Sequence, residues 1–248
     1  MFYPGLVSVS FRGHTPEKIL SAAAECQLKW IEWGSDVHAP PNDPSRLQAI
    51  VELQQRYGIS CSSYGTYFRL GYSDLAELPQ YIQAAKLLGT RILRLWAGRK
   101  VKEESTPQEW QSFVAQCRTA AAIAEAEDVV LCMECHRRSA TETKESACAL
   151  MTAVDSPAFR MYWQPNPELT IAENIAYIKL LRPWIAHVHV FHWMETERLS
   201  LTEGLEIWEK YLQALGPGRT LLLEFMPDDR IESLLDEAES LLSMTRLV

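Results

Sequence analysis

The stretch VVLCMECHRR, residues 129–138, decides how the rest of the chain is interpreted. Its first five residues form an apolar run of strand length that is too short to indicate a helix. The run leads into Glu134 and His136, which a period of two places on one face of a strand, roughly 7 Å apart. A buried carboxylate needs a partner. An arginine in a structural pair, a metal or a substrate would each provide one, and this stretch alone does not choose between them.

The same pattern of an apolar run followed by polar residues recurs along the chain. We expect strands at residues 6–12, 28–33, 59–67, 91–96, 129–133, 159–164, 184–191 and 220–225, each followed by a helix. Strict alternation predicts a parallel sheet of the α/β class. Eight such units in 248 residues predict a single (β/α)8 barrel domain over residues 1–248. An open doubly wound sheet is the alternative, but no glycine-rich phosphate loop follows the first strand.

Several helix ends carry local signals. Thr106 and Glu109 predict a capping box at the start of a long, alanine-rich helix. Ser73 is expected to cap the helix that ends at Gly89, and Asp228 is expected to open the last helix.

Composition limits the classes of function. The net charge of −8 argues against a protein that binds nucleic acid, which needs a basic face. No run of 18 apolar residues predicts a membrane span, and the N-terminus does not resemble a signal peptide. Cys132 and Cys135 form a single CxxC whose members face opposite sides of a strand, so we expect neither a zinc site nor a disulfide framework. These features predict a cytoplasmic protein with reduced thiols and leave a homo-oligomer open.

In a barrel, functional residues lie at the C-terminal ends of the strands. Four expected ends carry Glu134, Gln164, His189 and Glu224. Carboxylates and an imidazole are ligands for Mn²⁺, Zn²⁺ or Mg²⁺, and an amide oxygen can complete the set. Each residue alone is more often structural. Four such ends on adjacent strands favour a metal site over a polar network.

Aromatic residues also gather at the expected strand ends, namely Trp33, Tyr64, Trp96, Trp163 and Trp193. Such residues either pack the mouth of a barrel or stack on the C–H faces of a sugar ring. We interpret them as substrate contacts, together with His38, His136, Asn166 and Arg137.

Charged residues complete the expected site. Solvation is the expected state of Arg99, Lys100, Arg137 and Arg138, with one of them as the alternative contact for a substrate carboxylate or phosphate. Inside the barrel, Glu32 and Arg94 are predicted to form a buried structural pair.

Taken together, these residues resemble the sugar-phosphate isomerase/epimerase family with the xylose isomerase-like barrel. The segments that carry the resemblance are IEWGSDVH, LCMECH, HVHV and LLLEF, in this order along nearly the whole chain. The resemblance implies that Glu134, His189 and Glu224 hold one divalent metal ion. Where the family usually has Asp on the sixth strand, this chain has Gln164, and a neutral amide should weaken metal binding or change the preferred metal.

The resemblance also implies a function, that of a metal-dependent isomerase or epimerase of a sugar or sugar phosphate. Proton transfer would pass through a metal-stabilised enediolate, with Glu134 and Glu224 removing and returning the proton. His136 and Trp193 would contact the substrate. One alternative is a non-catalytic sugar-binding barrel that kept the metal pocket. Another is an endonuclease similar to DNA-repair enzymes on the same barrel, which the negative charge and few histidines disfavour.

Overall fold

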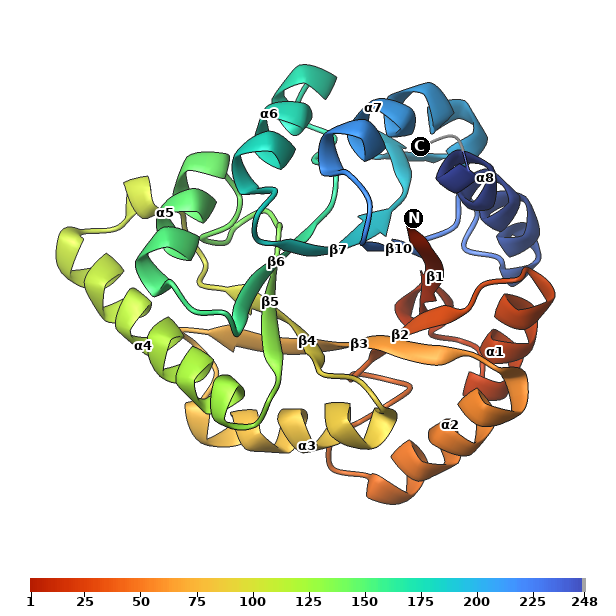
Figure 1. Ribbon diagram of the computed structural model, residues 1–248, viewed down its shortest axis with the longest axis horizontal. Coiled ribbons are helices and arrows are strands. Elements are labelled where there is room, and N and C mark those ends of the chain that lie inside the picture. Colours follow the sequence, from red (N-terminus) through yellow and green to blue (C-terminus); the bar gives the residue numbers. More distant parts are fainter. Residues whose placement is uncertain (247–248) are drawn as a thin grey trace.

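The computed structural model describes residues 1–246 and shows a closed barrel of parallel strands surrounded by helices (Figure 1). Each strand pairs with the next along the chain, and the last closes on the first. The barrel strands are β1 (Tyr3–Val7), β2 (Trp30–Gly34), β3 (Ser60–Leu70), β4 (Ile92–Ala97), β5 (Val130–Glu134), β6 (Phe159–Trp163), β7 (Ile185–Val190) and β10 (Thr220–Leu223). The predicted (β/α)8 barrel is therefore confirmed. The expected domain ends at residue 248, and its last two residues lie outside the described part.

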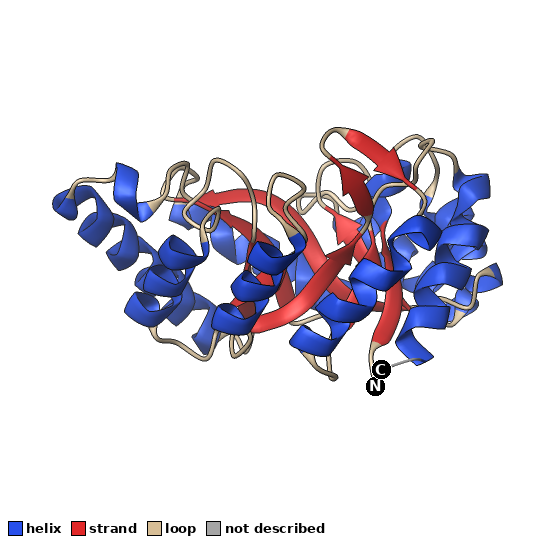
Figure 2. Cartoon of the chain, turned by 90° about the horizontal axis from the view of Figure 1, so that it is seen from above, coloured by secondary structure: helices blue, strands red, loops and turns tan. Residues whose placement is uncertain are grey.

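The helices form the outer layer around the strands (Figure 2). They are α1 (Pro16–Glu25), α2 (Pro44–Tyr57), α3 (Leu78–Leu88), α4 (Pro107–Ala126), α5 (Lys144–Val154), α6 (Ile171–Leu181), α7 (Leu205–Leu215) and α8 (Leu234–Arg246). The capping box of Thr106 and Glu109 is present. None of the described helices is long and apolar enough to cross a membrane.

Two predicted helix starts are wrong. The Ser73 hydroxyl accepts a hydrogen bond from Arg69 N and closes the turn after β3, while Asp74 caps a 3₁₀ turn (Leu75–Glu77) that precedes α3. Asp228 similarly accepts from Arg230 N, within a loop that leads through a 3₁₀ turn (Ile231–Ser233) into α8. In both places the polar residue caps a turn rather than the helix itself.

The first strand is shorter than predicted. β1 ends at Val7, and a 3₁₀ turn (Ser8–Phe11) follows. The hydroxyl of Ser8 accepts a hydrogen bond from Gly34 N at the end of β2, so the chain turns there and no longer extends the sheet. Arg12 consequently lies beyond the C-terminal end of the barrel.

A hairpin that was not predicted follows β7. Its strands β8 (His192–Met194) and β9 (Glu197–Leu199) pair antiparallel and form a separate small sheet. The pair projects beyond the loop-rich end of the barrel (Figure 2). This hairpin sets the position of Trp193.

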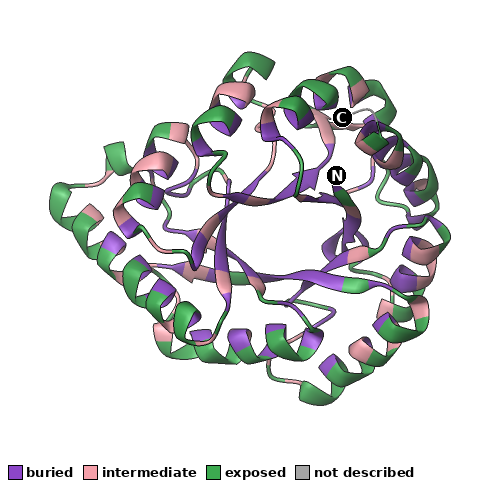
Figure 3. Ribbon diagram, viewed as in Figure 1, coloured by how far each residue is buried: buried purple, intermediate pink, exposed green. Residues whose placement is uncertain are grey.

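The barrel strands are almost fully buried, and the helices expose only their outer faces (Figure 3). Side chains alternate along each strand, so one set packs under the helices and the other fills the barrel. The interior set is partly polar and includes Glu32, Arg94 and His187. Gly65 makes room for two of them, because a Cβ at this position would lie 2.5 Å from Glu32 Oε1 and 2.8 Å from Arg94 Nη2. All six cysteines are free.

Candidate metal and substrate site

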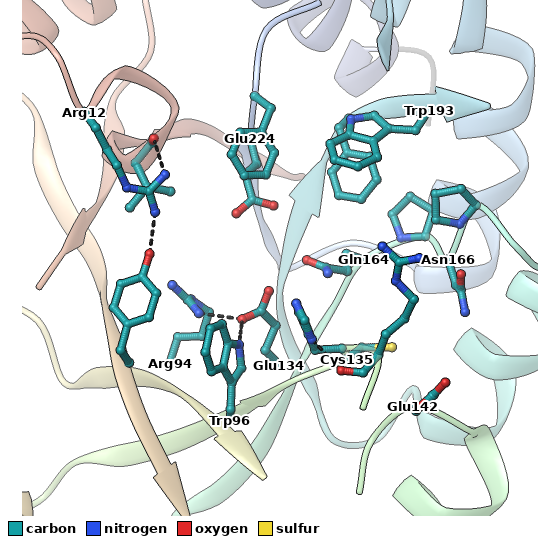
Figure 4. A pocket seen from close by; sticks show the side chains of 18 residues that line it. Arg12, Arg94, Trp96, Glu134, Cys135, Glu142, Gln164, Asn166, Trp193 and Glu224 are labelled. Carbon is teal, nitrogen blue, oxygen red and sulfur yellow. Dashed lines mark hydrogen bonds and ion pairs between the residues drawn. The ribbon is translucent and has the colours of Figure 1, made fainter. Parts of the chain in front are cut away.

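Glu134, His189 and Glu224 converge at the C-terminal end of the barrel. Glu134 is the last residue of β5, His189 lies near the end of β7, and Glu224 follows β10 directly. One potential ligand atom from each lies within 4.8 Å of the other two, and all three residues are buried. Nδ1 of His189 lies 3.4 Å from Glu224 Oε2 and 3.8 Å from Glu134 Oε1. Figure 4 shows the two carboxylates turned toward the same space.

Gln164 adds a fourth ligand atom to this group. It follows β6, and its Oε1 lies 3.0 Å from Nδ1 of His189. The amide is drawn beside Glu134 in Figure 4. The four strand ends that the sequence singled out therefore meet at one point.

Glu134 is held by only one of its oxygens. Oε2 accepts hydrogen bonds from Arg94 Nη1 and from Trp96 Nε1, each at 2.5 Å. Oε1 faces His189 instead. Burial acts to raise the pKa of Glu134, but the positive charges of Arg94 and His189 outweigh it and hold that pKa below its ordinary value. Glu134 is thus an ionised carboxylate with one oxygen available to a cation.

The predicted pair of Glu32 and Arg94 is present inside the barrel, with Arg94 Nε 2.9 Å from Glu32 Oε1. The prediction was incomplete, because Arg94 bridges Glu32 to Glu134 and also lines the cavity above them. Glu32 further accepts from the Ser63 hydroxyl at 2.9 Å and lies 3.6 Å from Nε2 of His189. His189 therefore lies between the Glu32 carboxylate, deeper in the barrel, and the carboxylates of Glu134 and Glu224 at its C-terminal end.

The charges in this group do not balance. Three buried carboxylates, Glu32, Glu134 and Glu224, face a single guanidinium, that of Arg94. Burial and then the negative charge of Glu134 raise the pKa of Glu224 above its ordinary value, despite the opposing charge of His189. Burial lowers the pKa of His189, but the carboxylates of Glu224 and Glu32 outweigh it and raise that pKa. Such an excess of buried negative charge is what a divalent cation neutralises.

The ligand set also fits a divalent cation. Two carboxylates, an imidazole and an amide oxygen suit Mn²⁺, Mg²⁺ or Zn²⁺. Nε2 of His189 has no hydrogen-bond partner among residues 1–246 but lies 3.6 Å from Glu32 Oε1, so a small shift would let this carboxylate orient a metal-binding histidine. Glu134, Gln164, His189 and Glu224 are thus able to hold the ion, with Glu32 positioned behind His189.

A cavity of about 240 Å³ opens above this group, and we call it the mouth cavity. Its wall contains five residues predicted as substrate contacts, namely Trp96, His136, Arg137, Asn166 and Trp193. His136 lies against Trp96, with ring centroids 5.2 Å apart. Arg137 pairs with Glu168 at the rim. The size of the mouth cavity and its mixed polar and apolar lining suit a small molecule.

The expected aromatic ring is not formed, because three of its members point away from the mouth cavity. Trp33 donates from Nε1 to Gln54 Oε1 on α2 at 2.7 Å, and Tyr64 donates to Ala39 O at 2.6 Å. Trp163 packs against Trp208 and Tyr211 of α7. Each follows a residue that points into the barrel, so alternation directs it toward the helices.

His38 is also absent from the cavity wall. It is buried, with its ring nitrogens 3.2 Å from Ser8 Oγ and 3.1 Å from His14 O. Burial lowers the pKa of His38, and the ring packs on Trp33. Its contacts are those of a structural histidine that joins the loops after β1 and β2.

Other residues line the cavity without having been predicted to contact substrate. Arg12 donates from Nε to Asp36 Oδ2 at 2.8 Å and from Nη2 to the Tyr67 hydroxyl. Figure 4 shows Arg12 on the cavity wall. Glu142 and Phe225 complete other parts of the wall. The one signal in the sequence was that Asp36 lies just after the expected second strand and Tyr67 at the end of the expected third strand. Nothing local indicated that Arg12 would join them.

Comparison with known proteins identifies the family. The model of the xylose isomerase-like TIM barrel family matches residues 20–243, so the chain belongs to this family, as the resemblance predicted. A 3-dehydroshikimate dehydratase from Bacillus anthracis is 26% identical over 126 residues. That match spans 48% of this chain and 41% of the dehydratase.

Several solved structures share the whole fold. A probable 3-DHS dehydratase from Bacillus anthracis superposes with a TM-score of 0.84 at 19% identity, covering 98% of this chain and 99% of that one. A D-psicose 3-epimerase, solved in the presence of D-fructose, has a TM-score of 0.71 at 13% identity and covers 100% and 99% of the two chains. The zinc-containing IOLI protein has a TM-score of 0.76 at 14% identity, with 98% and 96% covered. At these identities the likeness establishes the fold.

Proposed function

We propose that this protein is a divalent-metal-dependent isomerase or epimerase of a sugar or sugar phosphate. The observation that carries the proposal is the meeting of Glu134, Gln164, His189 and Glu224, with excess negative charge, at the floor of a small cavity. A divalent ion bound there would supply Lewis acidity, which makes a C–H bond beside a carbonyl group easier to ionise. Family membership and the sugar-processing proteins of the same fold support this choice.

Glu224 is the better placed of the two carboxylates to act as a base. Its side chain receives no hydrogen bond from the described residues, whereas Glu134 is held by Arg94 and Trp96. In this assignment Glu224 removes the proton, and Glu134 is chiefly a metal ligand.

His136 supplies a second acid–base group. Its Nδ1 lies 2.7 Å from Arg137 O, so that nitrogen carries the proton and donates it to the carbonyl oxygen. Nε2 is then the basic nitrogen, and the ring lies in the wall of the mouth cavity. His136 can therefore pass a proton to or from a substrate hydroxyl.

A dehydratase is the second candidate, and His136 is the observation that favours it. Loss of a proton from carbon is followed by its return in an isomerase or epimerase. In a dehydratase it is followed by departure of a hydroxyl group, which needs a proton donor such as His136. The partial match to a 3-dehydroshikimate dehydratase supports the same candidate.

Deuterium exchange tests the step that both candidates share. The Mn²⁺-loaded protein is incubated in D₂O with a panel of ketoses, their phosphates and 3-dehydroshikimate. Mass spectrometry detects exchange, and ultraviolet absorbance detects a new carbon–carbon double bond. We expect Glu224→Gln to lower exchange by about 10³-fold, within the range for loss of a general base. Glu237→Gln, which removes a buried carboxylate bonded to Leu201 N elsewhere in the fold, should exchange normally. Binding of a sugar without exchange would instead indicate the non-catalytic barrel.

A further inference from the structure

A second recess adjoins the mouth cavity, and we call it the arginine recess. It is lined by Arg69, Arg99 and Arg138 together with Tyr67, Tyr72 and Trp96. Tyr67 and Trp96 also line the mouth cavity, so the two spaces share a wall. The arginine recess is therefore a neighbour of the candidate metal site.

The three arginines lack acidic partners within the described chain. The three arginines that line the mouth cavity are each paired with a carboxylate, as Arg12 is with Asp36 and Arg137 with Glu168. No carboxylate of residues 1–246 forms an ion pair with Arg69, Arg99 or Arg138. The arginine recess thus gathers three positive side chains without a counter-ion from the described chain, in a protein whose net charge is −8. An anion bound there would relieve their mutual repulsion.

Two of the guanidinium groups are held in place by the protein. Arg69 donates from Nη1 to Gly98 O at 2.7 Å, and its Cζ lies 4.4 Å from the centre of the Trp96 ring. Cζ of Arg99 lies 4.3 Å from the centre of the Tyr72 ring. Stacking fixes each guanidinium plane and leaves N–H groups on its edge free to donate. Such edges bind phosphate and carboxylate oxygens in pairs.

Trp96 connects the recess to the candidate catalytic group. One part of its indole, Nε1, donates to Glu134 Oε2, while the ring stacks with Arg69. The guanidinium of Arg69 and the carboxylate of Glu134 are thus separated by a single indole. The two ends of an open-chain sugar that lies along Trp96 would be near these two groups.

We propose that the arginine recess binds the anionic end, a phosphate ester or a carboxylate, of the substrate whose carbonyl end enters the mouth cavity. This inference rests on the proposed function and narrows its substrate to a charged sugar derivative. The uncharged sugar should occupy the same cavity with lower affinity, because it leaves the three arginines without a partner.

Calorimetric titration of the Mn²⁺-loaded protein tests the proposal with three probes, D-ribulose 5-phosphate, D-glucuronate and uncharged D-ribulose. The test variant is the double substitution Arg99→Gln/Arg138→Gln, because both side chains are exposed and neither holds the fold. The control is Arg91→Gln, an exposed arginine just before β4, at the opposite end of the strand that Arg99 follows.

We expect the phosphate or the carboxylate to bind at least about tenfold more tightly than D-ribulose, in keeping with charge-assisted hydrogen bonds. The double variant should lose this preference and keep its affinity for D-ribulose, and Arg91→Gln should behave as the parent protein. The anionic probe that binds more weakly to the double variant identifies whether the arginine recess binds a phosphate ester or a carboxylate. Equal binding of all three probes, or an unchanged double variant, overturns the inference.

Failure of the inference and failure of the proposed function are distinguishable. Suppose that an uncharged sugar exchanges deuterium and that the double variant binds every probe as the parent protein does. The proposed function would then stand, and the inference that the arginine recess binds an anion would be wrong. Arginine-dependent binding of the phosphate without exchange into any sugar would support the recess and contradict the isomerase or epimerase.

Discussion

Nδ1 of His189 lies 3.0 Å from Oε1 of Gln164, closer than it lies to either neighbouring carboxylate. A ring nitrogen that donates its proton to an amide oxygen cannot also give its lone pair to a cation. Metal binding at this nitrogen therefore requires that proton to move, to Nε2 in the neutral ring or to solvent from the imidazolium form. Because the surrounding carboxylates raise the pKa of His189 despite its burial, that competition extends to higher pH than for an ordinary histidine.

The first prediction follows from this competition. Affinity for Mn²⁺ should fall by about tenfold for each unit that the pH drops below the pKa of His189, since one proton is displaced per ion. Titration of the metal-free protein at several pH values measures the slope. A flat profile between pH 5 and 8 would show that His189 is not a ligand.

The second prediction concerns the charge at position 164. Gln164→Asp should raise the affinity for Mn²⁺ by about tenfold, and Gln164→Ala should lower it by a similar factor, as expected for the gain or loss of a ligand group. The same titration compares the three proteins at pH 7.5. Three equal dissociation constants would remove Gln164 from the ligand set.

The third prediction ranks two substitutions in the barrel interior. Arg94→Met leaves Glu32 and Glu134 both without their cation and should cost about 3–5 kcal/mol of unfolding free energy, as for other broken buried pairs. Glu32→Gln should cost less, because Arg94 keeps Glu134. Urea denaturation of the metal-free proteins gives both values, and the reverse order would contradict the bridging role of Arg94.

The fourth prediction isolates one hydrogen bond of Trp96. Trp96→Phe keeps a ring beside Arg69 but removes the N–H that donates to Glu134. Metal affinity should fall by about tenfold, the lower end of the range for groups that orient a ligand. Trp163→Phe is a matched control, because Nε1 of Trp163 has no partner within the described chain. Equal affinities in the two variants would show that this hydrogen bond does not support the site.

The fifth prediction concerns acid stability. Burial lowers the pKa of His187 to about 4, from about 6.5 in an unfolded chain. Between these values the unfolded chain binds a proton that the folded protein excludes, so stability falls as the pH drops from 6.5 to 4. The loss from this residue should reach about 3 kcal/mol.

His187→Gln removes this titration and retains that of His189. The difference in unfolding free energy between the two metal-free proteins should therefore change by about 3 kcal/mol between pH 7 and pH 4, in favour of the variant. Urea denaturation at both pH values checks it. Parallel pH profiles would show that His187 is protonated inside the folded barrel.

Alternation along the strands explains both the success and the failure of inference from sequence. It correctly placed Glu32 and Arg94 inside the barrel, and it brought the ends of β5, β6, β7 and β10 together. The same rule that turns Glu32 into the barrel turns Trp33 outward, so adjacent residues on one strand cannot both face the interior. Trp163 follows the inward Tyr162 for the same reason.

Loop residues were less predictable, because their positions depend on contacts between distant segments. Arg12 reaches Asp36 and Tyr67 only after the loops following β1 and β2 have met the C-terminal part of β3. The hairpin that carries Trp193 turns through Glu195, which adopts a positive φ of 53°. Such a conformation usually favours glycine or asparagine, so this segment gave no hairpin signal.

Gly65 constrains how the barrel interior can change. The space that its side chain would fill is occupied by the Glu32 carboxylate and the Arg94 guanidinium, which come from the strands on either side. Even alanine at position 65 would displace one of them and, through Arg94, disturb Glu134. A side chain at position 65 therefore requires a smaller one at position 32 or 94. Among relatives, we expect any residue larger than glycine at position 65 to accompany a smaller side chain on a neighbouring strand.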